Sequence, residues 1–196
     1  MATTRRLVGW SGVDPNRVDS AFVTLGADRL SAHGTSTTPD YASRYSLTTG
    51  PRWETTALDV SIHDGRSLTL WRTDDGWSAT WRGAGTEEFE LPDLTGALDC
   101  DLGRCPLTNT MPVLRHRLLA AARTGDRSPV ELMMAWVSVP DLAVHVSRQT
   151  YSAAEPVDGG GALVHFESDD FATVIEFDAD AVVRNYPGLA YRSAGL

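Results

Sequence analysis

The segment 98–118 of this 196-residue chain has the densest set of side chains that could do chemistry. Asp99 and Asp101 lie two residues apart, so on a strand their carboxylates point to the same face. Paired carboxylates can exchange protons with a substrate or, with further oxygen ligands, hold a divalent cation. The pair is therefore a candidate for acid–base work on a glycosylated or acylated substrate.

Hydroxyl, amide and guanidinium groups follow this pair at Thr108, Asn109, Thr110 and Arg115. Such a cluster is typical of a site for a hydroxyl-rich head group, because each side chain can bond a hydroxyl or a charged oxygen. A structural turn is the alternative, with Asp paired to Arg and with Asn109 and Thr110 satisfying backbone groups. The residues alone leave both interpretations open.

Other reaction signatures are missing from the sequence. It has no G-x-S-x-G elbow, and the glycines at 159–161 lead into a strand pattern rather than the helix that a phosphate loop needs. Cys100 and Cys105 are too few for a zinc site, and we expect them to be free thiols. We predict no cofactor and no metal.

Short runs of β-forming residues separated by turn residues predict an all-β fold of about ten or eleven strands. The only helix expected is a short one over 113–123, ended by Gly125. The segments from which these ten or eleven strands could form are 21–25, 30–37, 41–49, 53–63, 67–73, 77–82, 98–102, 131–139, 142–151, 162–168, 171–178 and 182–186.

The strand over 131–139 is apolar on both faces, with Met134 and Trp136 on one face and Ala135 and Val137 on the other. A strand of this kind is covered on both sides by protein or by ligand.

The formal charge is −9, and all 17 basic residues are arginine. This acidic balance argues against a nucleic-acid binder. No run approaches the ~20 apolar residues of a membrane span. The start of the chain also lacks the apolar run of a signal peptide after Arg6. We therefore expect a soluble, cytoplasmic protein with no integral membrane segment.

Several of these residues carry a family resemblance. The motifs are 99–102 (DCDL), 108–110 (TNT) with Pro112 and Arg115, the segment from Trp136 to Pro140, Tyr151 and 186–188 (YPG), with Trp10, Gly34 and Trp53 nearer the start. Across essentially the whole chain, the sequence resembles the bacterial family called "putative glycolipid-binding". The resemblance implies a single domain over 1–196. It also implies one large, strongly curved antiparallel sheet, an incomplete barrel similar to LolA-like carriers, whose hollow can take acyl chains.

The leading functional hypothesis is binding of an amphipathic small molecule, a lipid or glycolipid, in the concave face of the sheet. Its tail would lie on an apolar face, for which the candidates are Trp81, Met134, Trp136, Val144 and Ile175. Its head would meet the polar cluster, whose members are Asp99, Asp101, Asn109, Thr110, Arg115 and Tyr151. The alternatives are a hydrolase that uses Asp99 and Asp101, and a structural or partner-binding β-protein. The oligomeric state is open.

Overall fold

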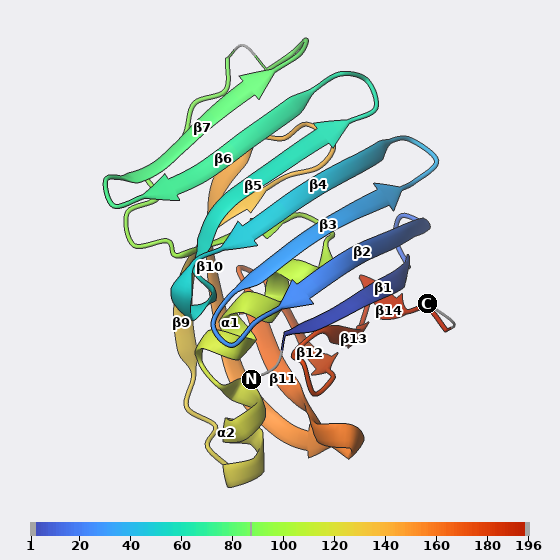
Figure 1. The fold of residues 1–196 in the computed structure, drawn as a ribbon, viewed down its shortest axis with the longest axis vertical. Helices are drawn as coiled ribbons and strands as arrows, with labels where there is room; N and C mark the ends of the chain where they lie inside the picture. The colour runs from blue at the N-terminus through green and yellow to red at the C-terminus, as the bar shows by residue number, and fades with distance from the viewer. Residues whose placement is uncertain (1–2, 87, 195–196) are drawn as a thin grey trace.

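The structure is a computed structural model that describes residues 3–86 and 88–194. Over these residues the chain forms one sheet of fourteen strands (Figure 1). The first seven are β1 (Thr4–Gly12), β2 (Arg17–Leu25), β3 (Leu30–Thr37), β4 (Ala42–Thr49), β5 (Thr55–Ile62), β6 (Ser67–Thr73) and β7 (Gly76–Arg82). The others are β8 (Asp99–Leu102), β9 (Val130–Val137), β10 (Val144–Val157), β11 (Gly161–Ser168), β12 (Phe171–Phe177), β13 (Val183–Tyr186) and β14 (Ala190–Arg192).

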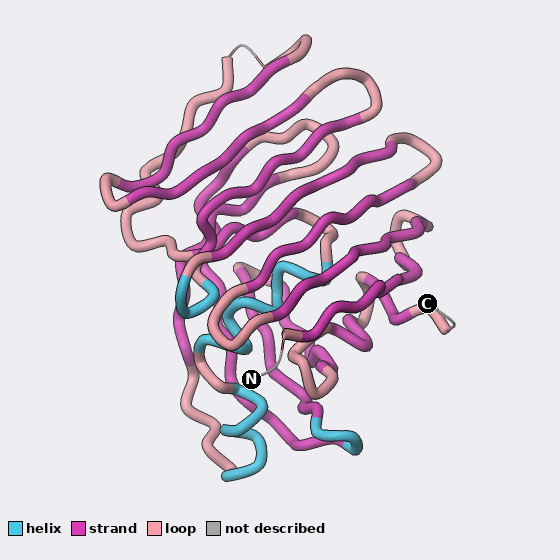
Figure 2. The backbone as a smooth tube through the Cα atoms, viewed as in Figure 1, coloured by secondary structure: helices cyan, strands magenta, loops and turns pink. Residues whose placement is uncertain are grey.

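The strand order is β7-β6-β5-β4-β3-β2-β1-β14-β13-β12-β11-β10-β9-β8, so the first and last strands of the chain meet in the middle of the sheet. Every neighbouring pair is antiparallel except β8 and β9, which run parallel. A parallel pair needs a long crossover connection. Here the crossover holds most of the helical structure, which Figure 2 shows as a minor part of the chain.

The helical segments are short. They are α1 (Thr110–Arg115), α2 (Leu118–Thr124) and the 3₁₀ turns η1 (Pro51–Trp53), η2 (Pro106–Asn109) and η3 (Asp158–Gly160). Arg117 has a φ of 54° and separates α1 from α2, and Gly125 with a φ of 78° ends α2. A left-handed residue cannot continue an α-helix, so the helix predicted over 113–123 is divided in two.

The sheet rolls up so far that its β8–β10 end lies inside the curve of β4–β7. One core fills the space between these two layers and includes Leu47, Leu70, Cys100, Ala135 and Val137. The ring nitrogen of Trp81, from the edge strand β7, donates to Leu142 O in the β9–β10 connection at 2.8 Å. We call the core between these two layers the interlayer core.

A second core lies on the concave face of the rolled end. It joins α2 to β9, β10, β11 and β12 through residues such as Leu118, Met134, Tyr151, Val164 and Ile175. Because β9 contributes to both cores with alternate residues, it is covered on both faces, as its two-sided apolar pattern predicts.

The all-β prediction with one large curved sheet is confirmed, and three details are corrected. The strand count is fourteen rather than ten or eleven, and none of the expected segments covers β1 or β14. β14 has only three residues, too few for a periodic signal. The sheet also contains the parallel β8–β9 pair, so it is not antiparallel throughout. The single helix is two short ones.

Candidate ligand pocket on the concave face

An open pocket of about 790 Å³ lies on the concave face of the rolled end, beside the second core. Its lining comes from strands β8–β13, from η2, and from the loops that follow β8, β11 and β13. A ligand pocket for a drug-sized molecule typically measures about 300–1,000 Å³, so this pocket has room for one.

Three aromatic rings form one wall. Phe166 of β11 lies with its ring centroid 6.2 Å from that of Phe171 and 5.8 Å from that of Tyr186, and the last two are 6.3 Å apart. Phe171 is 47% exposed, at the end of the β11–β12 hairpin. An exposed aromatic ring that borders a pocket offers an apolar contact surface to a bound molecule.

Trp136 and His145 form the opposite wall. They face each other across the β9–β10 ladder, and their ring centroids are 5.4 Å apart. Gly103 passes close to this pair: a Cβ at that position would lie 2.9 Å from Val137 O and 3.6 Å from the Trp136 ring. A side chain at position 103 would therefore push the β8–η2 loop away from the wall.

The floor is polar. Asp101 accepts a hydrogen bond from the Thr108 hydroxyl at 2.7 Å and from Gln149 Nε2 at 2.8 Å. The Tyr151 hydroxyl lies 2.9 Å from Asn109 Oδ1 and 3.0 Å from Gln149 Oε1, and it donates its one proton to one of them at a time. This network joins β8, η2 and β10 and fixes the orientation of Asp101, Asn109 and Gln149, which line the pocket.

Burial dominates the electrostatics of the floor. It raises the pKa of Asp101, while the hydrogen bonds from Thr108 and Gln149 oppose that rise. Burial and the nearby Asp101 carboxylate raise the pKa of Tyr151 well above its usual range. The tyrosine therefore stays a neutral hydroxyl at physiological pH.

Asp99 lies on the same face of β8 as Asp101 but points at Arg115 of α1, as a buried ion pair. Arg115 Nη1 donates to Asp99 Oδ1 at 2.8 Å, and Nη2 donates to Asp99 Oδ2. The Asp99 side chain is fully buried and that of Arg115 is 8% exposed. Burial raises the pKa of Asp99, and the guanidinium opposes this rise. The pair fastens α1 to β8 and does not line the pocket.

The predicted site residues thus separate into groups. Asp101, Asn109 and Trp136 line the pocket. Met134, Tyr151 and Ile175 are buried in the second core beneath it, and the Thr110 hydroxyl is buried without a hydrogen-bond partner. Trp81 and Val144 belong to the interlayer core.

Sequence reasoning missed several lining residues. They are His145, Ser147, Gln149, Phe166, Ser168, Phe171 and Tyr186. The signal that could have found those on β10 is alternation, because 145, 147 and 149 share one face with Tyr151. The position of these β10 residues beside Phe166 and Phe171 depends on how β10, β11 and β12 are aligned in the sheet, and the sequence does not specify that register.

The pocket lining combines apolar rings with fixed polar groups, so it can contact both an apolar and a polar part of one molecule. Among the described residues no group of three or more His, Cys, Asp or Glu side chains could hold a metal ion. Cys100 and Cys105 are free, as expected. Burial raises the pKa of Cys105 to about 11, so it is not an activated nucleophile.

The fold and pocket define a class: a protein whose single rolled β-sheet encloses an open pocket, aromatic on its walls and polar on its floor. The family model described as "Putative glycolipid-binding" matches residues 7–192, and the chain belongs to this family. It is similar to the crystal structure of a DUF1089 family protein from Pseudomonas aeruginosa. The two are 24% identical with a TM-score of 0.64, over 89% of this chain and 92% of that one. No curated protein matches the chain.

None of the described helices is long and apolar enough to cross a membrane.

Proposed function

We propose that this protein binds an amphipathic small molecule, a lipid or glycolipid, in the pocket on the concave face of its sheet. The observation that carries the proposal is the composition of that pocket. Its aromatic walls and its hydrogen-bonded polar floor line a single open space of about 790 Å³.

The apolar part of the ligand would lie against Phe166, Phe171 and Tyr186. These rings form one cluster, in which Phe166 and Tyr186 are 4% and 7% exposed and Phe171 leaves nearly half of its area uncovered. Covering such a surface with an acyl chain is favourable by roughly 25 cal/mol per Å².

The head group would meet Asp101, Asn109 and Gln149, with Trp136 beside them as a stacking face for a sugar ring. The charged side chains that line the pocket are Asp101, Asp169, Asp170 and a single arginine, Arg104. Such a lining disfavours a phosphate or carboxylate and favours an uncharged, hydroxyl-rich head. A glycolipid therefore suits the pocket better than an anionic phospholipid.

The test is a binding series in which the tail is constant and the head changes. Dodecyl maltoside and dodecyl phosphate share a twelve-carbon tail, and both can be titrated below their micelle concentrations by calorimetry. We expect the maltoside to bind at least tenfold more tightly. Equal affinity would reject the head-group proposal, and no binding of either, together with a ligand-free mass in native mass spectrometry, would reject the function itself.

A tryptophan pair locates the binding site. Trp136→Ala should weaken maltoside binding at least tenfold. Trp71→Ala should not, because Trp71 lies on the face of β6 opposite to the buried Leu70 and does not line the pocket. Equal affinities in the two variants would place the ligand elsewhere. Both proteins should keep the far-ultraviolet circular dichroism of a folded β-sheet, which confirms that the loss concerns the pocket.

The hydrolase hypothesis for Asp99 and Asp101 stays a prediction. Asp101 faces the pocket, but both oxygens of Asp99 are engaged by Arg115, so a reaction would have to proceed with Asp101 alone. The cytoplasmic location is likewise a proposal. The supporting observation is that both thiols are free, as is usual in a reducing compartment.

A further inference from the structure

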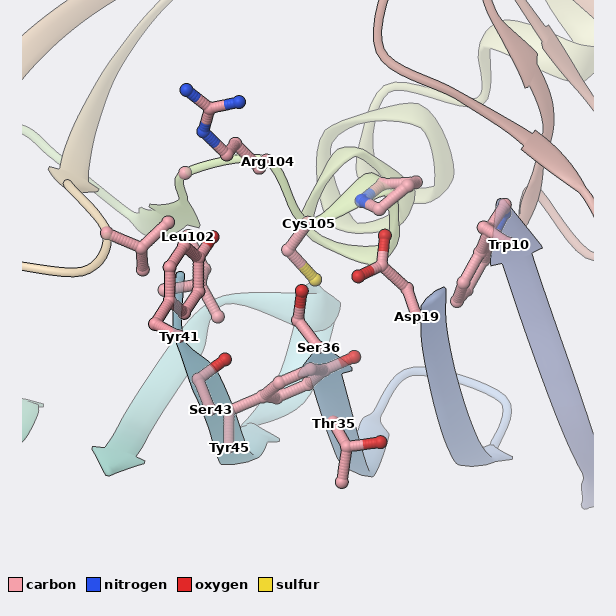
Figure 3. Close-up of a pocket in the computed structure, with 13 residues that line it drawn as sticks. Trp10, Asp19, Thr35, Ser36, Tyr41, Ser43, Tyr45, Leu102, Arg104 and Cys105 are labelled. Atoms are coloured by element: carbon pink, nitrogen blue, oxygen red, sulfur yellow. The ribbon is translucent and has the colours of Figure 1, made fainter. Parts of the chain in front are cut away.

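A second, much smaller cavity lies on the other side of the loop that borders the ligand pocket. Its volume is about 20 Å³, and the loop residues Leu102, Arg104 and Cys105 line both cavities. The opposite wall comes from β2, β3 and β4. Figure 3 shows the carboxylate of Asp19, the hydroxyl of Ser36 and the sulfur of Cys105 directed toward one another, while Thr35 points away.

Three polar atoms that border this cavity are buried without a hydrogen-bond partner: Asp19 Oδ1, Ser36 Oγ and the Tyr41 hydroxyl. The Asp19 and Tyr41 residues are 6% and 7% exposed. Burial raises the pKa of both groups, and the Ser36 hydroxyl opposes the rise in each case. Ser36 therefore lies near both groups, but at a geometry that leaves its hydroxyl without a hydrogen-bond partner in the protein. Buried polar atoms in folded proteins nearly always have a partner, so this trio calls for one.

Charge decides what kind of partner fits. Arg17 Nε donates to Asp19 Oδ2 at 2.8 Å, and its Nη2 donates to Arg104 O at 2.7 Å. The arginine already compensates the carboxylate, so a metal cation would meet an adjacent positive charge. A neutral group that both donates and accepts suits a carboxylate oxygen and two hydroxyls.

The volume of the cavity limits which neutral molecule could occupy it. A cavity needs roughly 10–15 Å³ of free volume to hold one water molecule, which commonly makes two to four hydrogen bonds. The cavity of about 20 Å³ is thus large enough for one water and too small for a sugar or an acyl chain.

We propose that this cavity is a hydration site holding one water molecule, which donates to Asp19 Oδ1 and bonds the hydroxyls of Ser36 and Tyr41. The water links β2, β3 and the β3–β4 turn beneath the loop from Leu102 to Cys105. Asp19 is joined to that loop through Arg17, which bonds both Asp19 and Arg104 O, so the water supports this wall of the large pocket indirectly.

A high-resolution crystal structure of the full chain tests the site directly. We expect a density peak within about 2.5–3.2 Å of Asp19 Oδ1 and of Ser36 Oγ. A cavity without a peak, or a direct hydrogen bond between Ser36 and Asp19 that closes it, would overturn the proposal.

Substitution gives a second, independent measurement. Ser36→Ala and Tyr41→Phe each remove one partner of the water and should lower the melting temperature by about 2–4 °C. The controls are Ser31→Ala, on the other face of β3, and Tyr191→Phe, which is 53% exposed. If each variant melts at the temperature of its control, the polar trio contributes nothing and the hydration site is refuted.

Discussion

The two faces of β9 show how one strand builds two kinds of region. Ala135 and Val137 point into the interlayer core and are fully buried. Trp136, between them, points the other way and borders the open pocket. On β10 the pocket face carries Ser147 and Gln149. The interlayer face is therefore closed by apolar packing, and the concave face is left partly open with polar groups.

The difference comes from what covers each face. The inner face of β4–β7 meets the back of β8–β10 along its length, and aliphatic side chains fill the gap. On the concave face, α1 and α2 cover only the end near Leu118 and Ala122. The uncovered remainder is the pocket. Closed packing on one face stabilises the fold, and incomplete cover on the other leaves the pocket open.

The largest expected loss of stability comes from a substitution in the covered part of the concave face. Arg115→Ala leaves the buried Asp99 carboxylate without its partner and should lower the free energy of unfolding by about 3–5 kcal/mol. The control is Arg66→Ala, which removes a surface pair with Asp64 and should cost about 0–1 kcal/mol. Urea unfolding measures both. A loss below about 1 kcal/mol for Arg115→Ala would show that the pair is not a structural anchor.

Neighbouring residues of β9 test the two faces against each other. Val137→Ala should cost about 2–3 kcal/mol of stability, because it leaves a cavity in the interlayer core. Trp136→Ala should cost about 1 kcal/mol while weakening ligand binding. If Trp136→Ala destabilised the protein more than Val137→Ala does, the pocket wall would belong to the core. Thermal melts and calorimetric titration of the same samples provide the comparison.

The polar floor should contribute less to stability than either core. Tyr151→Phe deletes the hydroxyl that bonds Asn109 or Gln149 and should cost about 1–2 kcal/mol by chemical unfolding. The ring would stay in place against Phe166, whose centroid lies 5.1 Å away. A neutral result would mean that water replaces the hydroxyl, and hence that the floor is wet rather than tightly networked.

The smallest effect is a pH dependence. Burial raises the pKa of Asp101 above its ordinary 3.8, so the folded state binds the proton more tightly than the unfolded state does. The resulting stabilisation is present below pH ~4 and is lost as the pH rises through the folded-state pKa. The melting temperature of the native protein should therefore fall, relative to that of Asp101→Asn, as the pH rises from about 4.

Asp93→Asn is the control for this pH series. The pKa of Asp93 is lowered by hydrogen bonds from Thr95, so its trend should have the opposite sign. Parallel curves for the two variants would contradict the assignment of the effect to burial of Asp101.

Part of this structure could be predicted from local sequence patterns, and the rest depends on contacts between residues far apart in the chain. The hairpins from β2 to β7 and the two-sided burial of β9 follow from alternation and turn residues. Asp101 and Asn109 could be singled out because polar groups cluster between 98 and 118. Asp99 could not be separated from Asp101, since both have the same parity on β8 and only the position of Arg115 distinguishes them.

The aromatic wall escaped prediction for a related reason. Phe166 and Phe171 face the pocket because β11 and β12 pair in a particular register, and Tyr186 joins them across a β-bulge between β12 and β13. Such pairings are set by the packing of the whole sheet. The parallel placement of β8 beside β9 depends on the path of the helical crossover, which no local periodicity encodes.

The central position of β1 has a consequence for how the protein is made. β1 pairs with β2 on one side and with β14 on the other (Figure 1). In addition, Arg6 Nη2 of β1 donates a hydrogen bond to Asp178 Oδ2 at 2.8 Å. On the ribosome β1 emerges first and β14 last, so one edge of β1 waits unpaired until nearly all of the chain has been synthesised. Unpaired edges promote aggregation, and closure between distant segments is slow. The unpaired edge of β1, which lies in the middle of the finished sheet, is therefore the edge that we expect to be exposed to aggregation for longest during synthesis, and it is where a chaperone would be most useful.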